Sequence, residues 1–116
     1  MNKNYKEMAD ELSASIGRLK DFMPDLMNGF SEMAAAAKAE GSLDPKTKEL
    51  IATAIGIAVR CDGCIATHAK AAERNGASRD EILETLGMAI YMGGGPSVVY
   101  AIQALDAFDQ FYDDAN

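Results

Sequence analysis

Both cysteines of the chain and its only histidine fall within the eight residues 61–68, in the stretch RCDGCIATHAK. A helix turns by about 100° per residue, so Cys61, Cys64 and His68 would share one helical stripe. The first helical turn favours a thiolate, because its backbone N–H groups are unpaired and the helix dipole is positive there. Two cysteines spaced C-x-x-C can close a disulfide, and an imidazole one turn further can exchange protons with a sulfur. The spacing therefore predicts thiol redox chemistry.

Two carboxylates accompany this stretch. Asp62 lies beside Cys61 and would oppose a thiolate there, which favours Cys64 as the more acidic thiol. Glu49 is the one carboxylate in the otherwise apolar segment that precedes Cys61. In an antiparallel helical hairpin around Cys61, Glu49 would lie about 18 Å from the turn and His68 about 10 Å from it. A buried carboxylate needs a partner, so Glu49 is a candidate partner for His68, and an exposed position at a helix start is the alternative.

The elements that must position these residues are all predicted to be helices. No segment alternates apolar and polar residues with the period of two that a half-buried strand shows. Asp44 and Pro45 are typical of a helix start, Gly76 of a left-handed stop, and Ser78 opens a capping box. We expect one all-α domain over residues 1–116, with about six helices: 4–23, 24–39, 45–60, 61–75, one from Ser78 to the glycines at 93–95, and one from Pro96 onward.

Helical spacing also predicts which side chains face a core. The segment 50–59 is apolar almost all round, which predicts burial on every side, in part against a neighbouring subunit. The remaining expected inward positions are as follows: Tyr5, Met8, Leu12, Ile16, Leu19 and Met23; Leu26, Met27, Phe30, Met33 and Ala37; Ile82, Leu83, Leu86, Met88, Ala89, Ile90 and Met92; Val98, Ala101, Leu105, Phe108 and Tyr112. The expected solvent face of the last helix holds Gln103, Asp106, Gln110 and Asp113.

Composition narrows the classes of function. The formal net charge is −7 and no basic run is present, so nucleic acids and anionic membranes would repel the chain. No stretch approaches the roughly 20 apolar residues of a membrane span, and the first residues lack the apolar core of a signal peptide. We therefore expect a cytoplasmic protein, in which a C-x-x-C pair is redox-active or metal-binding rather than a structural disulfide. The apolar helices predict a homo-oligomer.

The spacing of Glu49, eleven residues, Cys61-Asp62-Gly63-Cys64, three residues and His68 resembles the alkylhydroperoxidase D-like branch of the carboxymuconolactone decarboxylase family. The resemblance is strongest over residues 43–105. It implies an all-helical fold that assembles as a homo-trimer or homo-hexamer, and a thiol peroxidase or disulfide reductase activity without a cofactor. Several members carry a histidine between the cysteines, where this chain has Gly63.

The same resemblance implies roles for the four residues. Cys64 would attack the peroxide and become a sulfenic acid, and Cys61 would then form the disulfide. Glu49 and His68 would relay protons. The implied partners are a hydroperoxide substrate and a reductant protein that carries a thiol or a lipoyl group, including thioredoxin-like proteins.

Two other functions stay open on the residues alone. A lyase acting on a small cyclic acid would use His68 and Glu49, with Arg60 or Lys70 binding the substrate carboxylate. A non-enzymatic helical module could be stabilised by oligomerisation, or by zinc bound to Cys61, Cys64, His68 and Glu49. The two cysteines could also be ordinary core residues.

Overall fold

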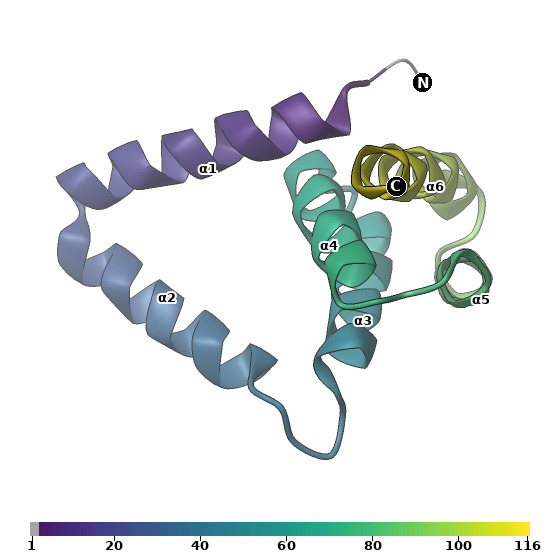
Figure 1. Cartoon of the computed structure of the whole chain (residues 1–116), viewed down its shortest axis with the longest axis horizontal. Helices are drawn as coiled ribbons and strands as arrows, with labels where there is room; N and C mark the ends of the chain where they lie inside the picture. Colours follow the sequence, from purple (N-terminus) through teal and green to yellow (C-terminus); the bar gives the residue numbers. More distant parts are fainter. Residues whose placement is uncertain (1–2) are drawn as a thin grey trace.

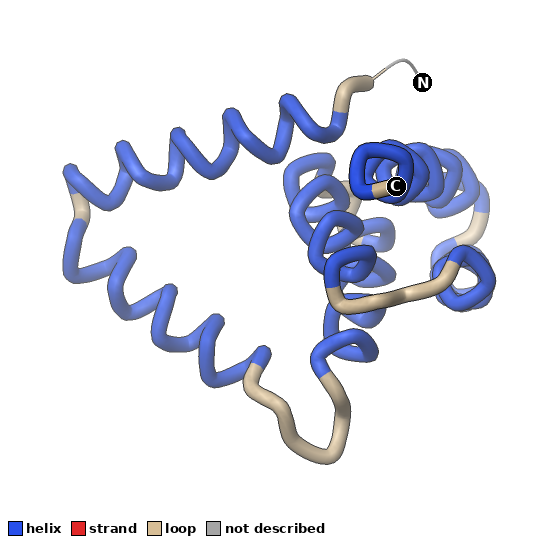
Figure 2. Tube along the Cα trace, viewed as in Figure 1, coloured by secondary structure: helices blue, strands red, loops and turns tan. Residues whose placement is uncertain are grey.

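The computed structural model describes residues 3–116, and every regular element within them is an α-helix (Figure 2). This confirms the all-α prediction and the expected number of helices. Observed ends differ from the expected ones by up to two residues. The helices are α1 (Tyr5–Phe22), α2 (Pro24–Lys38), α3 (Pro45–Ala58), α4 (Asp62–Arg74), α5 (Arg79–Gly93) and α6 (Gly95–Ala115).

Local sequence signals account for the helix ends. The Asp44 side chain accepts a hydrogen bond of 2.7 Å from the Thr47 backbone N–H, directly before the proline that begins α3. The capping box at the start of α5 is complete, since Ser78 and Glu81 bond reciprocally. Gly76 follows α4 with a φ of 87°, a left-handed conformation that favours glycine. These three predicted signals are confirmed.

The core forms where α3 and α4 pack against α5 and α6 (Figure 1). Most of its buried side chains are small, and this lets the helices approach closely. The larger ones are Tyr5, Ile57, Ile65, Ile82 and Phe108, all fully buried. Gly56 near the end of α3 contacts Cys64 near the start of α4, and Glu49 near the start of α3 contacts His68 further along α4, so the two helices run antiparallel.

Helices α1 and α2 form an arm, residues 5–38, that leaves the core and returns to it at α3 (Figure 1). Helix α2 contacts no helix other than α1 and α3. The radius of gyration is 14.3 Å, slightly above the about 13 Å expected for a chain of this length, because the arm projects. None of the α2 side chains is buried, so the predicted inward stripe of this helix is wrong for the single chain.

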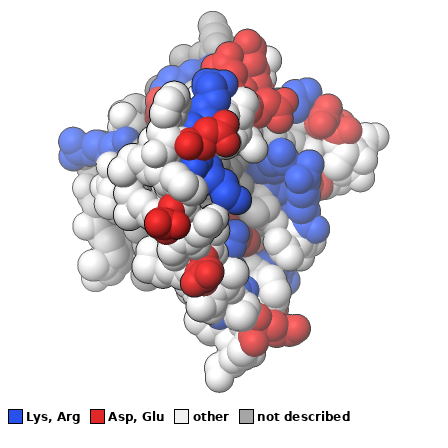
Figure 3. All heavy atoms as spheres, turned by 90° about the vertical axis from the view of Figure 1, so that its left-hand side faces the viewer, with Lys and Arg blue, Asp and Glu red and all other residues white. Residues whose placement is uncertain are grey.

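Other predicted core positions are also exposed in the single chain, among them part of the 50–59 segment, which was predicted to be buried in part against a neighbouring subunit. Exposed side chains lie along α1, α3, α5 and α6, and Figure 3 shows uncharged surface between separated acidic and basic groups on the side of the arm. The amphipathic pattern identifies an apolar face, but it does not say whether the same chain covers that face. The large apolar side chains of the predicted core that are exposed are Ile16, Leu19, Met23, Leu26, Phe30, Met33, Ile51, Ile55, Val59, Leu83, Met88, Met92, Val98 and Tyr112.

Helix α6 contains a residue that was predicted to be exposed and is buried. Gln103, predicted to face solvent, is only 7% exposed. The N-terminal segment, residues 3–6, lies over this part of α6 and covers the Gln103 side chain. The periodicity of α6 alone cannot reveal this contact. Within residues 3–116 no helix has the length and apolar character needed to cross a membrane.

Candidate active site

The predicted site residues lie at the tight connection between α3 and α4. Helix α3 ends at Ala58, and Arg60 takes a left-handed conformation with a φ of 59°. A non-glycine residue adopts this conformation at a cost of about 1 kcal/mol, which the surrounding hydrogen bonds must offset. The Cys61 backbone N–H donates to the Gly56 carbonyl oxygen at 3.0 Å, and this bond turns the chain into α4.

Cys61 and Cys64 form a disulfide across the first turn of α4, with 5.2 Å between their Cα atoms. Cys61 is the N-cap residue, and its sulfur accepts a hydrogen bond of 3.2 Å from the Cys64 backbone N–H. Both residues are half-buried. On reduction the sulfurs face the positive end of the α4 dipole, which stabilises a thiolate. The predicted juxtaposition of the two cysteines at a helix start is confirmed.

Gly56 lets α3 approach α4 behind Cys64. A Cβ atom at Gly56 would lie 3.2 Å from the Cys64 Cβ and 3.6 Å from the Ile65 backbone nitrogen. Any side chain would therefore press against the redox motif. The sequence shows Gly56 as one of several small residues in α3, and only the packing distinguishes it from the others.

Glu49 and His68 are in direct contact. The His68 Nδ1 lies 2.7 Å from the Glu49 Oε2, which joins α3 to α4. Glu49 is only 6% exposed, whereas His68 is half-buried. When the Glu49 carboxylate is ionised it only accepts hydrogen bonds; Nδ1 then donates to it, and Nε2 is left to exchange protons elsewhere. The predicted contact is present, and the alternative of an exposed Glu49 is wrong.

The register of the hairpin explains how the expected gap between these side chains closes. The contact between Gly56 and Cys64 places the centre of the turn near Arg60 rather than at Cys61. Glu49 and His68 then differ by about three residues in their distance from the turn, which is about 4.5 Å along the axis. Their side chains are long enough to span that offset.

A second polar cluster lies against the redox motif and was missed by the sequence patterns. The Lys3 Nζ lies 2.7 Å from the Asp62 Oδ2 and 2.7 Å from the Gln103 Oε1. The buried Tyr5 hydroxyl donates to the same Gln103 oxygen at 3.2 Å. Burial, followed by the negative charge of Asp62, raises the pKa of Tyr5 from 10.0 to about 12. Because the members come from the start, the middle and the last helix of the chain, no local spacing could indicate the cluster.

A groove of about 400 Å³ runs between α1 and α4 beside the motif. Its end at α1 reaches the redox turn, since a Cβ on Gly63 would lie 2.9 Å from a methyl group of Leu12. Lys70 and Arg74 supply positive charge along the α4 wall. The groove therefore has a mostly apolar side on α1 and a cationic side on α4. Its lining residues are Ala9, Leu12, Ser13, Ile16, Thr67, Lys70, Ala71, Arg74 and Asn75.

A disulfide leaves Cys61 and Cys64 without a thiolate to offer a metal ion. Over residues 3–116, no three His, Cys, Asp or Glu side chains are grouped as metal ligands. The residues that the sequence singled out are thus brought together as a disulfide and an adjacent Glu–His pair.

These features define a class of protein: a small all-helical domain with a C-x-x-C disulfide at a helix start. The profile of the carboxymuconolactone decarboxylase family matches residues 24–107, and the chain belongs to this family. The match begins before residue 43 and so includes α2, beyond the region of strongest resemblance.

Similar proteins support the same membership. The crystal structure of apo-lpg0406, a carboxymuconolactone decarboxylase family protein from Legionella pneumophila, is 47% identical and superposes with a TM-score of 0.91. The match covers 93% of this chain and 96% of that one. An uncharacterized protein of Cupriavidus necator is 38% identical, over 94% of this chain and 96% of its own length. One of Haemophilus influenzae is 35% identical, over 93% and 96%.

Proposed function

We propose that this protein is a thiol-based oxidoreductase that reduces hydroperoxides through Cys64 and Cys61. One observation carries the proposal: the two sulfurs pair at the positive end of α4, one turn before a histidine held by a buried glutamate. The alkylhydroperoxidase D-like resemblance of this spacing supports the same chemistry. The reaction needs only side chains of this chain and a reductant.

The first half of the proposed cycle reduces the substrate. The Cys64 thiolate attacks the outer oxygen of the hydroperoxide, and the O–O bond breaks as a sulfur–oxygen bond forms. The leaving alkoxide takes a proton delivered by His68, which Glu49 orients and stabilises in its charged form. Cys64 is thereby oxidised to a sulfenic acid, and the hydroperoxide is reduced to an alcohol.

The second half restores the dithiol. The Cys61 thiolate attacks the sulfur of Cys64, and the sulfenic hydroxyl leaves as water after receiving a proton. The resulting disulfide accepts two electrons and two protons from an external dithiol by thiol–disulfide exchange. We propose a thiol- or lipoyl-bearing protein as this reductant. A cytoplasmic location fits this cycle, because reducing systems there return the disulfide to its dithiol form.

The test is a thiol count before and after one equivalent of hydroperoxide. The reduced protein is labelled with maleimide and its intact mass is measured, with the metal content read on the same sample. We expect two labels to be lost without bound metal. Cys64→Ser should abolish peroxide consumption, whereas Cys61→Ser should stop at a trapped sulfenic acid. Full turnover by both variants would refute the proposal.

A lyase is the second candidate, because the family takes its name from a decarboxylase and the groove beside the motif carries Lys70. In that case Lys70 would bind the carboxylate of a small cyclic acid, and Glu49 with His68 would move the proton. Activity on such an acid that survives alkylation of both cysteines would favour the lyase. Loss of that activity on alkylation would count against it.

We also propose that the protein works as a homo-oligomer, as a trimer or a hexamer. The support is the exposed apolar face of α2, where Phe30 is 56% exposed, together with the apolar side chains exposed on α3, α5 and α6. A chain of this size rarely leaves so many large apolar groups in water. Light scattering at micromolar concentration should give the mass of three or six chains.

A further inference from the structure

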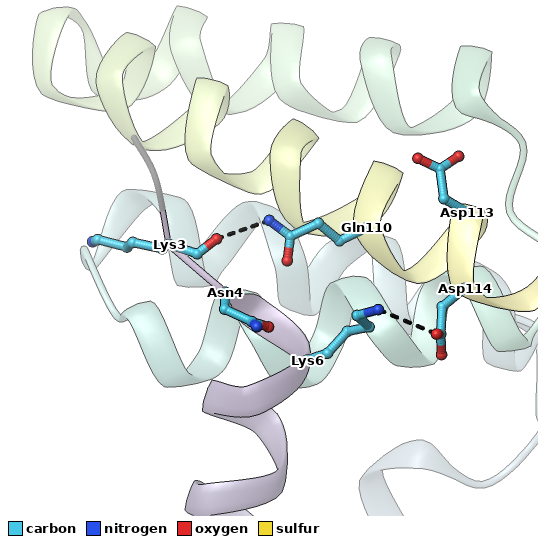
Figure 4. Close-up of a pocket in the computed structure, with 6 residues that line it drawn as sticks. All are labelled: Lys3, Asn4, Lys6, Gln110, Asp113 and Asp114. Carbon is cyan, nitrogen blue, oxygen red and sulfur yellow. Dashed lines mark hydrogen bonds and ion pairs between the residues drawn. The ribbon is translucent and has the colours of Figure 1, made fainter.

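The residues that precede α1 are held against α6. The Tyr5 backbone N–H donates to the Gln110 Oε1 at 2.8 Å, and the Gln110 Nε2 donates to the Lys3 carbonyl oxygen at 2.8 Å. Lys6 adds an ion pair of 3.2 Å to Asp114 (Figure 4). A single glutamine thus fixes the backbone on both sides of Asn4, and this determines where the Lys3 side chain can reach.

The Lys3 side chain extends away from Gln110 (Figure 4). Its Nζ pairs with Asp62, which belongs to the redox motif. Its ammonium group bridges the Asp62 carboxylate and the buried side-chain oxygen of Gln103, at 2.7 Å to each. Asp62 stands between the two cysteines, and its Oδ1 is buried with no hydrogen-bond partner in the described structure. The Asp62 side chain is 39% exposed, and Lys3 is the cation that pairs with it.

The pairing of Asp62 with Lys3 affects how readily the neighbouring thiols ionise. A carboxylate next to a thiol disfavours the thiolate, and an ammonium group paired with the carboxylate removes most of this effect. Other charged and titratable groups lie near the motif or near Tyr5 without a hydrogen bond to Asp62. Arg60 precedes Cys61 in the turn, and Glu49 on α3 pairs with His68 on α4. Tyr100 and Asp106 on α6 act on Tyr5, as Asp62 does.

We propose that Lys3 is a positioning residue that neutralises Asp62 and so keeps the reduced Cys61–Cys64 pair reactive. The proposal rests on the proposed redox function, because it concerns the reactivity of the same two sulfurs. It assigns a role to the N-terminal segment, which lies outside the matched family region of residues 24–107. The segment acts through charge, not through contact with the substrate.

The experiment measures the rate at which iodoacetamide alkylates the reduced full-length protein between pH 5 and 9, by intact mass. Alkylation forms a carbon–sulfur bond with loss of iodide and reports the thiolate directly. We expect Lys3→Met to slow the reaction about two- to fivefold at pH 7 and to move the profile to higher pH, as for a partly exposed ion pair. Lys3→Arg, which keeps the charge, should retain the wild-type rate.

Two further variants separate charge from structure. Lys6→Met removes the same charge from the same segment but pairs with Asp114, so its rate should equal that of the wild type. Asp62→Asn in the Lys3→Met background removes the uncompensated carboxylate and should restore the rate. A merely structural role for Lys3 predicts no such rescue.

The proposal is overturned if Lys3→Met alkylates at the wild-type rate, or if the double variant stays slow. Hydroperoxide consumption by the wild type is assayed separately. Reactive thiols that consume no hydroperoxide would refute the peroxidase function, while the alkylation rates would still decide the role of Lys3.

Discussion

Gly56→Ala tests whether the approach of α3 to Cys64 is as close as the structure shows. Alanine is favoured over glycine inside a helix by about 1 kcal/mol, so the substitution would stabilise α3 if the space were free. The new Cβ would instead lie 3.2 Å from the Cys64 Cβ, tighter than an ordinary van der Waals contact. Overpacking of this kind costs about 1–3 kcal/mol. We expect a net destabilisation of about 1 kcal/mol in the oxidised protein.

The destabilisation caused by Gly56→Ala should depend on whether Cys61 and Cys64 form the disulfide. In the oxidised protein the disulfide fixes Cys64 to Cys61, so its Cβ cannot move away from the new methyl group. In the reduced protein Cys64 is free of that restraint and can shift by a few tenths of an ångström. The oxidised form should therefore be destabilised more than the reduced one. A difference of about 1 kcal/mol corresponds to a rise of about 20 mV in the reduction potential.

The assay is urea denaturation at one protein concentration, with and without reductant, together with equilibration in a glutathione buffer. Gly87→Ala is the matched control, because Gly87 is exposed within α5 and a Cβ there would meet nothing within 4 Å. The control should be more stable than the wild type by about 1 kcal/mol in both states. The reasoning fails if Gly56→Ala gains the same stability as this control in both redox states.

Three further substitutions test other parts of the structure. The pKa of Tyr5 is raised from 10.0 to about 12, so the protonated phenol is favoured in the folded state. Its contribution to the free energy of unfolding is fully present below pH 10 and is lost between about pH 10 and 12. Tyr5→Phe should cost about 1 kcal/mol at pH 7 and should lack this loss in alkaline denaturation curves. Glu49→Gln should lower the rate of peroxide consumption about tenfold or more by leaving His68 without a charged partner. Phe30→Asp should reduce the mass measured by light scattering, because it places a charge on the exposed face of α2.

Each of these has a control from the same chain. Tyr91→Phe changes a tyrosine that is 79% exposed and should leave the alkaline transition intact; an equal change would remove the assignment to Tyr5. Glu84→Gln, exposed on α5, should keep full turnover, and wild-type turnover in Glu49→Gln would contradict the proton relay. Glu32→Gln changes an exposed polar group of α2 and should assemble normally. Unchanged assembly in Phe30→Asp would argue against α2 as an interface.

Much of this molecule follows from neighbours in the sequence. N-cap residues such as Asp44 and Ser78 act within one helical turn, so the starts of α3 and α5 could be predicted from residue types alone. The shared stripe of Cys61, Cys64 and His68 is likewise a consequence of helix geometry at spacings of three and four. Local chemistry of this kind determined the all-helical fold and the central part of the site.

The tertiary structure decided what depends on register and on distant segments. The contact of Glu49 with His68 could be established only once the position of the turn was known. The role of Gly56 became clear only from the close approach of α3 to α4. The burial of Gln103 and the pairing of Lys3 with Asp62 join residues that are far apart in the sequence, and periodicity carries no information about such contacts. For α2, the sequence gives an apolar face, and the fold shows that this chain does not cover it.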